Sequence, residues 1–157
     1  MSTMVKILEI LSDEDIQWLL SMGMEEQLEP EAVLIREGEF TEAVYIVLEG
    51  LLGVFVSAGG YKQVAAIGAG EIIGEMSYLE NEPTSATVIA VEPSIVLSIS
   101  KDAIDDRISA DPTFGNRLYR GIGVAISQRL RRTMGRIEFM LMQLEIAKKY
   151  PAESLDK

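Results

Sequence analysis

Residues 32 to 99 form a succession of short apolar runs, most of them separated by glycine. Several short strands with glycine turns at near-regular spacing are typical of an antiparallel barrel or jelly roll. The segment Ser57-Ala58-Gly59-Gly60 is the clearest hairpin tip among the turns. We therefore expect a mainly β fold, an antiparallel jelly roll (double-stranded β-helix), with strands at Ala32–Ile35, Ala43–Leu48, Leu51–Val56, Gln63–Ile67, Glu71–Ile73, Thr87–Val91 and Ile95–Ile99.

Helical patterns flank this β region on both sides. Upstream, Val5–Leu11 and Ser12–Met22 predict two short helices. The second has Ser12 as its N-cap and Asp15 three residues later, with acidic residues in its first turn. Downstream, the sequence predicts another short helix at Ser100–Ile108.

After Pro112 the pattern becomes helical and stays so to about residue 150. Apolar residues recur every three or four positions, which predicts one amphipathic helix of roughly nine turns. One small barrel cannot bury such a stripe, so we expect the part beyond about Leu130 to pack on the same helix of a second copy, forming a homodimer. The stripe consists of Phe114, Leu118, Ile122, Ile126, Leu130, Met134, Ile137, Leu141 and Leu144.

The length of 157 residues suits one domain with a normal core. We expect residues 1–111 to form the β-roll with its N-terminal helices. Residues 112–150 would form the long C-terminal helix, acting as hinge and dimer interface, and residues 151–157 a short tail.

Charge is unevenly distributed along the chain. The net charge is −11, and residues 1 to 111 carry 21 acidic and 5 basic side chains, whereas residues 112 to 157 carry 4 acidic and 9 basic ones. The acidic body should repel nucleic acid and anionic membranes. We interpret the helix arginines as neutralising the acidic body of the same or a second copy, rather than contacting nucleic acid or a ligand. They are Arg117, Arg120, Arg129, Arg131, Arg132 and Arg136.

The chain lacks residue types that several classes of functional site require. The chain has no cysteine and no histidine, which excludes thiolate metal sites, disulfides and histidine-rich metal sites such as those of cupin-type barrel enzymes. We interpret the paired acids Asp105 and Asp106 as a solvated helix face, because no partner nucleophile accompanies them. We expect no catalytic residue, no metal site and no required cofactor. With no secretory signal or membrane span in the pattern, we expect a cytoplasmic protein.

The stretch Gly70–Val91 has the pattern of a binding loop. Two isoleucines precede Gly74 and Glu75. The run Met76–Leu79 predicts one helical turn, and Asn81-Glu82-Pro83 ends that turn before the next strand. Glycine lets a ligand approach the main chain closely, and unpaired N–H groups at a helix start attract anions.

This stretch resembles the phosphate-binding cassette of the cyclic-nucleotide-binding domain family, which includes catabolite-activator-type regulators, kinase regulatory subunits and gated channels. The resemblance rests on Gly74-Glu75, the apolar residues that follow, and the pattern Pro-X-X-Ala-Thr-Val at residues 83–88. Upstream, residues 34–39 and 43–50 resemble the early strands of the family and their glycine-bounded turns. The resemblance implies a ligand site formed by Gly74, Glu75, Met76, Ser77, Thr84 and Ser85, with Glu75 bonding a ribose hydroxyl.

The chain departs from the family at one position. The family pairs the cyclic phosphate with an arginine nine positions after the cassette glutamate, and here that position is Thr84. Loss of a charge-assisted partner from an enclosed anion costs about 2 to 5 kcal/mol. Hydroxyls at Thr84 and Ser85, with backbone N–H groups, could still hold a phosphate-like or neutral ligand at lower affinity.

The resemblance thus implies a non-enzymatic regulatory module that senses cAMP, cGMP or a related small ligand and relays its presence through the C-terminal helix. The alternative is a ligand-free domain that acts in dimerisation or in binding a protein partner. We expect no DNA binding by this chain alone, because DNA-binding members of the family carry a separate module after this helix.

Overall fold

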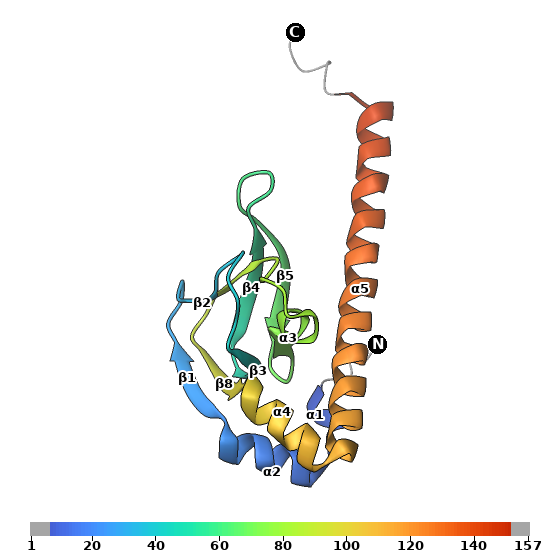
Figure 1. Ribbon diagram of the computed structural model, residues 1–157. Helices are drawn as coiled ribbons and strands as arrows, with labels where there is room; N and C mark the ends of the chain where they lie inside the picture. Colours follow the sequence, from blue (N-terminus) through green and yellow to red (C-terminus); the bar gives the residue numbers. More distant parts are fainter. Residues whose placement is uncertain (1–6, 152–157) are drawn as a thin grey trace. The chain divides into compact units, whose positions relative to one another are not determined.

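The computed structural model describes residues 7–151 (Figure 1). The chain divides into two compact units, Met1–Ala125 and Ile126–Lys157. The first unit holds all of the strands that the structure describes, and a single helix, α5, runs from the first unit into the second.

The first unit is built around two four-stranded antiparallel sheets (Figure 1). One sheet has the order β1-β8-β3-β6, formed by Met24–Leu28, Ser94–Ser100, Ala43–Glu49 and Ile72–Ile73. The other has the order β2-β7-β4-β5, formed by Val33–Ile35, Thr87–Ala90, Leu51–Val56 and Lys62–Gly68. The predicted antiparallel β fold with flanking helices is therefore confirmed.

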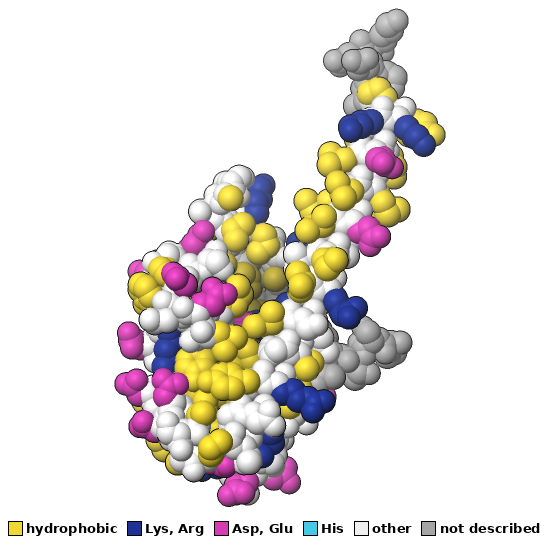
Figure 2. Space-filling model, turned by 45° about the vertical axis from the view of Figure 1, so that its right-hand side comes forward, with side chains coloured by type: hydrophobic (Ala, Val, Ile, Leu, Met, Phe, Trp, Pro, Cys, Tyr) yellow, Lys and Arg dark blue, Asp and Glu magenta, His cyan; other side chains and the backbone are white. Residues whose placement is uncertain are grey.

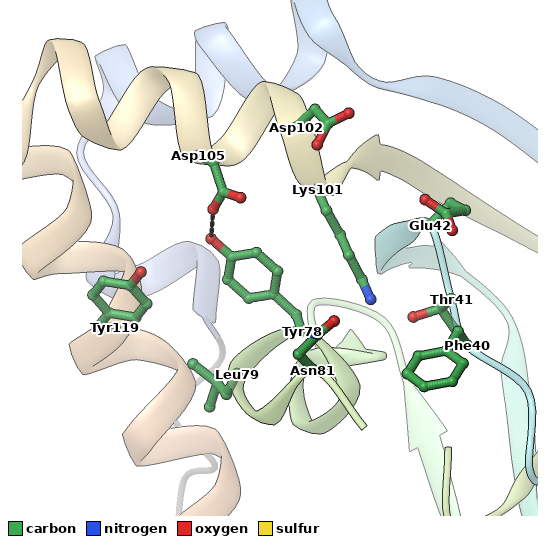
Figure 3. A pocket seen from close by; sticks show the side chains of 10 residues that line it. All are labelled: Phe40, Thr41, Glu42, Tyr78, Leu79, Asn81, Lys101, Asp102, Asp105 and Tyr119. Atoms are coloured by element: carbon green, nitrogen blue, oxygen red, sulfur yellow. Dashed lines mark hydrogen bonds between the residues drawn. The ribbon is translucent and has the colours of Figure 1, made fainter. Parts of the chain in front are cut away.

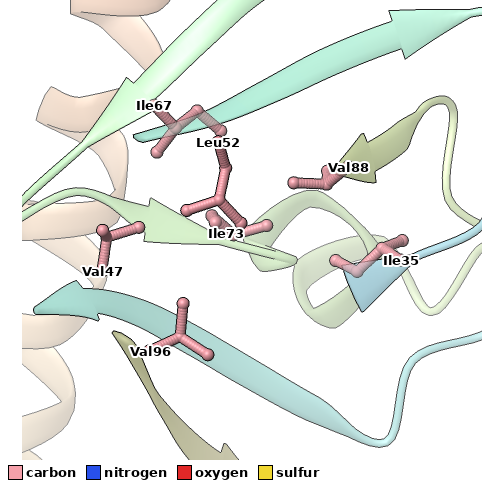
Figure 4. Packing of buried hydrophobic residues seen from close by; sticks show 7 residues of the cluster. All are labelled: Ile35, Val47, Leu52, Ile67, Ile73, Val88 and Val96. Atoms are coloured by element: carbon pink, nitrogen blue, oxygen red, sulfur yellow. The ribbon is translucent and has the colours of Figure 1, made fainter. Parts of the chain in front are cut away.

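The main hydrophobic core lies between these sheets, because both contribute to the same cluster of buried side chains (Figure 4). Val47 and Val96 come from one sheet and Leu52 comes from the other, and all three are fully shielded from solvent. Burial of apolar side chains of this size stabilises the fold by about 1.5 to 3 kcal/mol each. The remaining members of the cluster are Ile35, Ile67, Ile73 and Val88.

Helices cover the other face of the first sheet. The helix α2 (Asp13–Met22) and the helix α4 (Lys101–Ala110) both contact β8, where Leu97 and Ile99 are buried. The short helix α1 (Ile7–Ile10) precedes them, and residues 5 and 6 of its predicted range lie outside the described residues. The N-cap predicted at Ser12 is confirmed as a full capping box with Asp15.

Strand β1 was not predicted from the sequence. Its residues, Met24 to Leu28, read MEEQL, and the first four are exposed. The strand pairs only with β8 at the edge of its sheet, so it needs no buried alternating face of its own. The predicted hairpin at 57–60 is confirmed between β4 and β5, where Gly60 N–H donates to the Ser57 carbonyl over 3.1 Å.

The long helix α5 spans Pro112–Lys149, as the apolar stripe predicts. Within the first unit, Phe114, Leu118 and Ile122 of this stripe are buried. Within the second unit, the stripe is exposed from Leu130 onward, and Figure 2 shows mostly apolar side chains along this part of the helix, with some acidic and basic ones among them. Over residues 7–151, none of the helices combines the length and hydropathy that a bilayer crossing requires.

Candidate ligand-binding site

Gly74 sets the start of the predicted cassette. Strand β6 ends at Ile73, Gly74 adopts a left-handed conformation with φ +86°, and helix α3 (Glu75–Glu80) begins at the next residue. A Cβ at Gly74 would lie 3.3 Å from the Ala43 carbonyl oxygen, so both conformation and space favour glycine here. The predicted helical turn is confirmed, and it ends at Asn81, which is also left-handed.

Two polar side chains of α3 are buried. Glu75 is 4% exposed and Ser77 is 3% exposed. The Ser77 hydroxyl donates to the Glu82 carbonyl oxygen over 2.6 Å, which fixes the loop that returns from α3 towards β7. Met76, between them, is half exposed. The first turn of α3 therefore carries one buried carboxylate, that of Glu75. The backbone around it is held by the left-handed turn at Gly74 and by the hydrogen bond from Ser77 to Glu82.

Thr84 is tied to the connection between β2 and β3. Its hydroxyl donates to the Arg36 carbonyl oxygen over 2.7 Å, and its N–H donates to the Glu39 carbonyl oxygen over 2.9 Å. In return, Gly38 N–H donates to the Thr84 carbonyl oxygen over 2.8 Å. The residue at the family's arginine position thus holds two loops together.

Ser85 differs from its neighbour. It is exposed, and its hydroxyl makes no hydrogen bond to any residue in the described part of the chain. Of the two hydroxyls that the sequence places at this end of the cassette, the one on Ser85 is the more available to a ligand.

The acidic residues around the cassette have distinct surroundings. The Glu71 carboxylate accepts the Gly68 N–H over 2.7 Å and so closes its own turn. Glu80 and Glu82 are exposed. Water screens exposed charges strongly, so their repulsion of an anionic ligand is weaker than their number suggests. Among residues 7–151, no group of three or more acidic side chains is placed to hold a metal ion.

A cavity of about 670 Å³ lies beside the far end of α3 (Figure 3). None of the six predicted site residues lines it. No local pattern in the sequence indicates this cavity, because its walls come from four separate stretches of chain. The lining residues are Phe40, Thr41, Glu42, Tyr78, Leu79, Asn81, Lys101, Asp102, Asp105 and Tyr119.

Tyr78 links α3 to α4 within this cavity. Its hydroxyl donates to the Asp105 carboxylate over 2.6 Å. Asp105 is exposed, as predicted for a solvated helix face, and it also accepts this hydrogen bond from α3. Burial raises the pKa of the Tyr78 phenol above its ordinary value, and hydrogen bonding with Asp105 and Tyr119 raises it further. The phenol is therefore protonated at neutral pH and is held as a hydrogen-bond donor.

Comparison with known proteins identifies the family. The model of the cyclic nucleotide-binding domain matches residues 25–111, which is more than half of the chain. The chain therefore belongs to the cyclic nucleotide-binding domain family. The matched residues contain all the strands from β2 to β8 and the whole cassette.

Three similar proteins illustrate the range of the family. A cGMP-dependent protein kinase of Eimeria tenella is 31% identical over 64% of this chain and 10% of the kinase. The Cyclic AMP receptor protein of Thermus thermophilus is 27% identical over 94% of this chain and 66% of the receptor. The crystal structure of a cyclic nucleotide-binding domain from Methylobacillus flagellatus KT has a TM-score of 0.77 at 28% identity, covering 83% of this chain and 80% of that one.

The chain spans a tenth of the length of the kinase and just under two thirds of the length of the receptor. These relatives therefore share with it the nucleotide-binding domain rather than their full architecture.

Proposed function

We propose that this chain is a non-enzymatic regulatory module that binds cAMP, cGMP or a related small ligand at the cassette. The residues concerned are Gly74, Glu75, Met76, Ser77, Thr84 and Ser85. The observation that carries the proposal is the nearly buried carboxylate of Glu75, directly after left-handed Gly74 at the start of α3. A carboxylate is a strong hydrogen-bond acceptor, and a ribose hydroxyl is a suitable donor to it.

The names of the relatives support this class of ligand. One of them is a cGMP-dependent kinase and another is a Cyclic AMP receptor protein. The cyclic phosphate would meet the Ser85 hydroxyl and nearby N–H groups instead of a guanidinium. A missing charge-assisted partner costs about 2 to 5 kcal/mol, which is a factor of roughly thirty to several thousand in affinity.

We further propose that α5 carries the signal. Tyr78 connects the cassette helix to Asp105 of α4, and Tyr119 of α5 lines the same cavity. A ligand shifts such a connection only if it binds one arrangement better than another. The exposed apolar stripe of α5 would pair two copies in a cytoplasmic homodimer.

The proposal is tested by calorimetric titration of the full chain with cAMP and with cGMP. We expect one of them to bind, and Glu75→Gln to weaken its binding at least about tenfold, which corresponds to about 1.4 kcal/mol. Thr84→Arg should strengthen binding, because it restores the charge that the family places there.

The matched control is Glu80→Gln, which removes an exposed carboxylate from the same helix. It should leave binding within about twofold. If neither nucleotide binds to the natural chain or to Thr84→Arg, the proposal is wrong, and a ligand-free interaction module becomes the better account.

A further inference from the structure

The cavity at the far end of α3 contains none of the six residues proposed to bind the nucleotide, although Tyr78, Leu79 and Asn81 in its wall belong to the same stretch of chain. Its volume of about 670 Å³ lies within the range of about 300 to 1,000 Å³ that small-molecule sites occupy. Its walls come from the β2–β3 connection, the end of α3, the start of α4 and Tyr119. All of these belong to the first unit.

Thr41 brings a buried hydroxyl to this cavity. The residue is only 9% exposed, and its hydroxyl oxygen makes no hydrogen bond within the described part of the chain. Buried polar groups are nearly always hydrogen-bonded, so an unpartnered one needs a reason. Figure 3 shows this hydroxyl on the cavity side of Thr41.

Lys101 brings a positive charge to the same place. Figure 3 shows its side chain extending from the start of α4 into the space between Tyr78 and Thr41. Its backbone N–H donates to the Glu42 carbonyl oxygen over 3.1 Å, which fixes where the side chain starts. Its ammonium group forms no ion pair with any residue between 7 and 151. A positive charge and an unpartnered hydroxyl on the walls of one cavity suit a ligand carboxylate.

Three carboxylates also line the cavity, so a simple anion does not suit it. Glu42, Asp102 and Asp105 outnumber the single ammonium of Lys101. Asp105 uses one carboxylate oxygen, Oδ1, for the Tyr78 hydroxyl, and its other oxygen can accept further hydrogen bonds. A ligand that offers negative charge to Lys101 and positive charge to the acids therefore suits these walls best.

We propose that this cavity is a second ligand site, which binds a small zwitterion of the α-amino acid type. The ligand carboxylate would bind Lys101 and Thr41, and its ammonium would bind Asp105 and Asp102. Phe40 and Leu79 would contact the ligand side chain. The site shares no residue with the six proposed for the nucleotide, and binding there does not require a cyclic nucleotide.

The test is thermal unfolding of the full chain with each of the twenty proteinogenic L-amino acids in turn. Acetate and methylammonium serve as probes that carry only one of the two charges. A ligand at ten times its dissociation constant should raise the midpoint temperature by about 4 °C for a domain of this size. We expect at least one amino acid to do so, and neither single-charge probe to do so at the same concentration.

Variants decide where the amino acid binds. Lys101→Met and Thr41→Val should abolish the shift, whereas Thr41→Ser, which keeps the hydroxyl, should preserve it. The matched control is Lys62→Met, which removes an exposed lysine from β5. Circular dichroism of each variant without ligand establishes that it is folded, and Thr41→Val keeps the shape of the side chain.

The proposal is wrong if no amino acid shifts the midpoint, if acetate shifts it equally, or if Lys101→Met leaves the shift unchanged. Glu75→Gln separates the two proposed sites. It should weaken cyclic-nucleotide binding while the amino acid still binds, so that failure at one site is distinguishable from failure at the other.

Discussion

At the scale of single residues, Asp15 joins parts of the chain that are far apart in sequence. Its carboxylate is fully buried and accepts two hydrogen bonds, of 2.6 and 2.8 Å, from the guanidinium group of Arg117. The two residues are 102 positions apart in the sequence. Asp15 also forms the capping box of α2 with Ser12. For Arg117, the prediction that helix arginines neutralise the acidic body is therefore confirmed.

This pair should make stability depend on pH in acid. Hydrogen bonding with Arg117, opposed by burial, lowers the pKa of Asp15 from 3.8 to about 2. Because the folded pKa is the lower one, the contribution is fully present above about pH 4 and is lost as the pH falls towards 2. It amounts to about 2 kcal/mol of unfolding free energy.

Urea denaturation between pH 6 and pH 2 measures this contribution. The natural chain should lose about 2 kcal/mol more than Asp15→Asn over that interval, since the variant lacks the titrating group. Parallel pH profiles for the two proteins would contradict this account of the pair.

Gly74 gives a second prediction at this scale. Gly74→Ala places a Cβ at φ +86° and 3.3 Å from a carbonyl oxygen, so we expect a loss of about 1 to 2 kcal/mol in unfolding free energy. The matched control is Gly135→Ala in α5, where a Cβ meets nothing within 4 Å. Because alanine favours helix, that change should stabilise by about 0.5 to 1 kcal/mol. Equal effects of the two substitutions, measured by urea denaturation, would contradict the role given to Gly74.

Spacing along the sequence located the cassette but could not show what each side chain does there. The count of nine residues after Glu75 identifies Thr84 as the departure from the family. Only the structure shows that its hydroxyl is bonded to Arg36, which leaves Ser85 the more exposed of the two. A hydrogen bond between loops that are far apart in the sequence leaves no local sequence pattern from which it could be predicted.

At the scale of elements, α5 has a different character in each unit. Phe114, Leu118 and Ile122 are buried in the first unit, whereas Ile137, Leu141 and Leu144 in the second are more than half exposed. An exposed stripe of this kind is typical of a helix that packs on a partner.

We therefore expect the chain to dimerise through this stripe. Leu141→Glu places a charge in the predicted seam and should shift the protein to monomer at micromolar concentrations in analytical ultracentrifugation. The matched control, Gln143→Glu, adds the same charge on another face of the helix and should leave the dimer intact. A natural chain that stays monomeric, or a Leu141→Glu protein that stays dimeric, would contradict the prediction.

Elements with strong local signals were predictable. Glycine turns and apolar runs gave seven of the strands, and capping residues gave the start of α2. Strand β1 was missed because an edge strand with exposed residues has no apolar alternation. Its place is set by pairing with β8, which lies about seventy positions away in the sequence.

At the scale of the whole molecule, the fold class follows from the sequence, whereas the cavity at the far end of α3 does not. The cavity depends on the end of α3 meeting the start of α4 and the β2–β3 connection, so it exists only once the roll has formed. Its chemistry rests on Thr41, Lys101 and Asp105, which have no common motif in the sequence.

The central claim is that the cassette binds a cyclic nucleotide, and amide chemical shifts of the ¹⁵N-labelled chain test it most directly. On addition of cAMP or cGMP, we predict that the largest shifts fall at Gly74 to Ser77 and at Thr84 and Ser85. The resonances of Lys62, at the start of β5, should change little. Shifts that are absent, or that are centred elsewhere in the chain, would contradict the account.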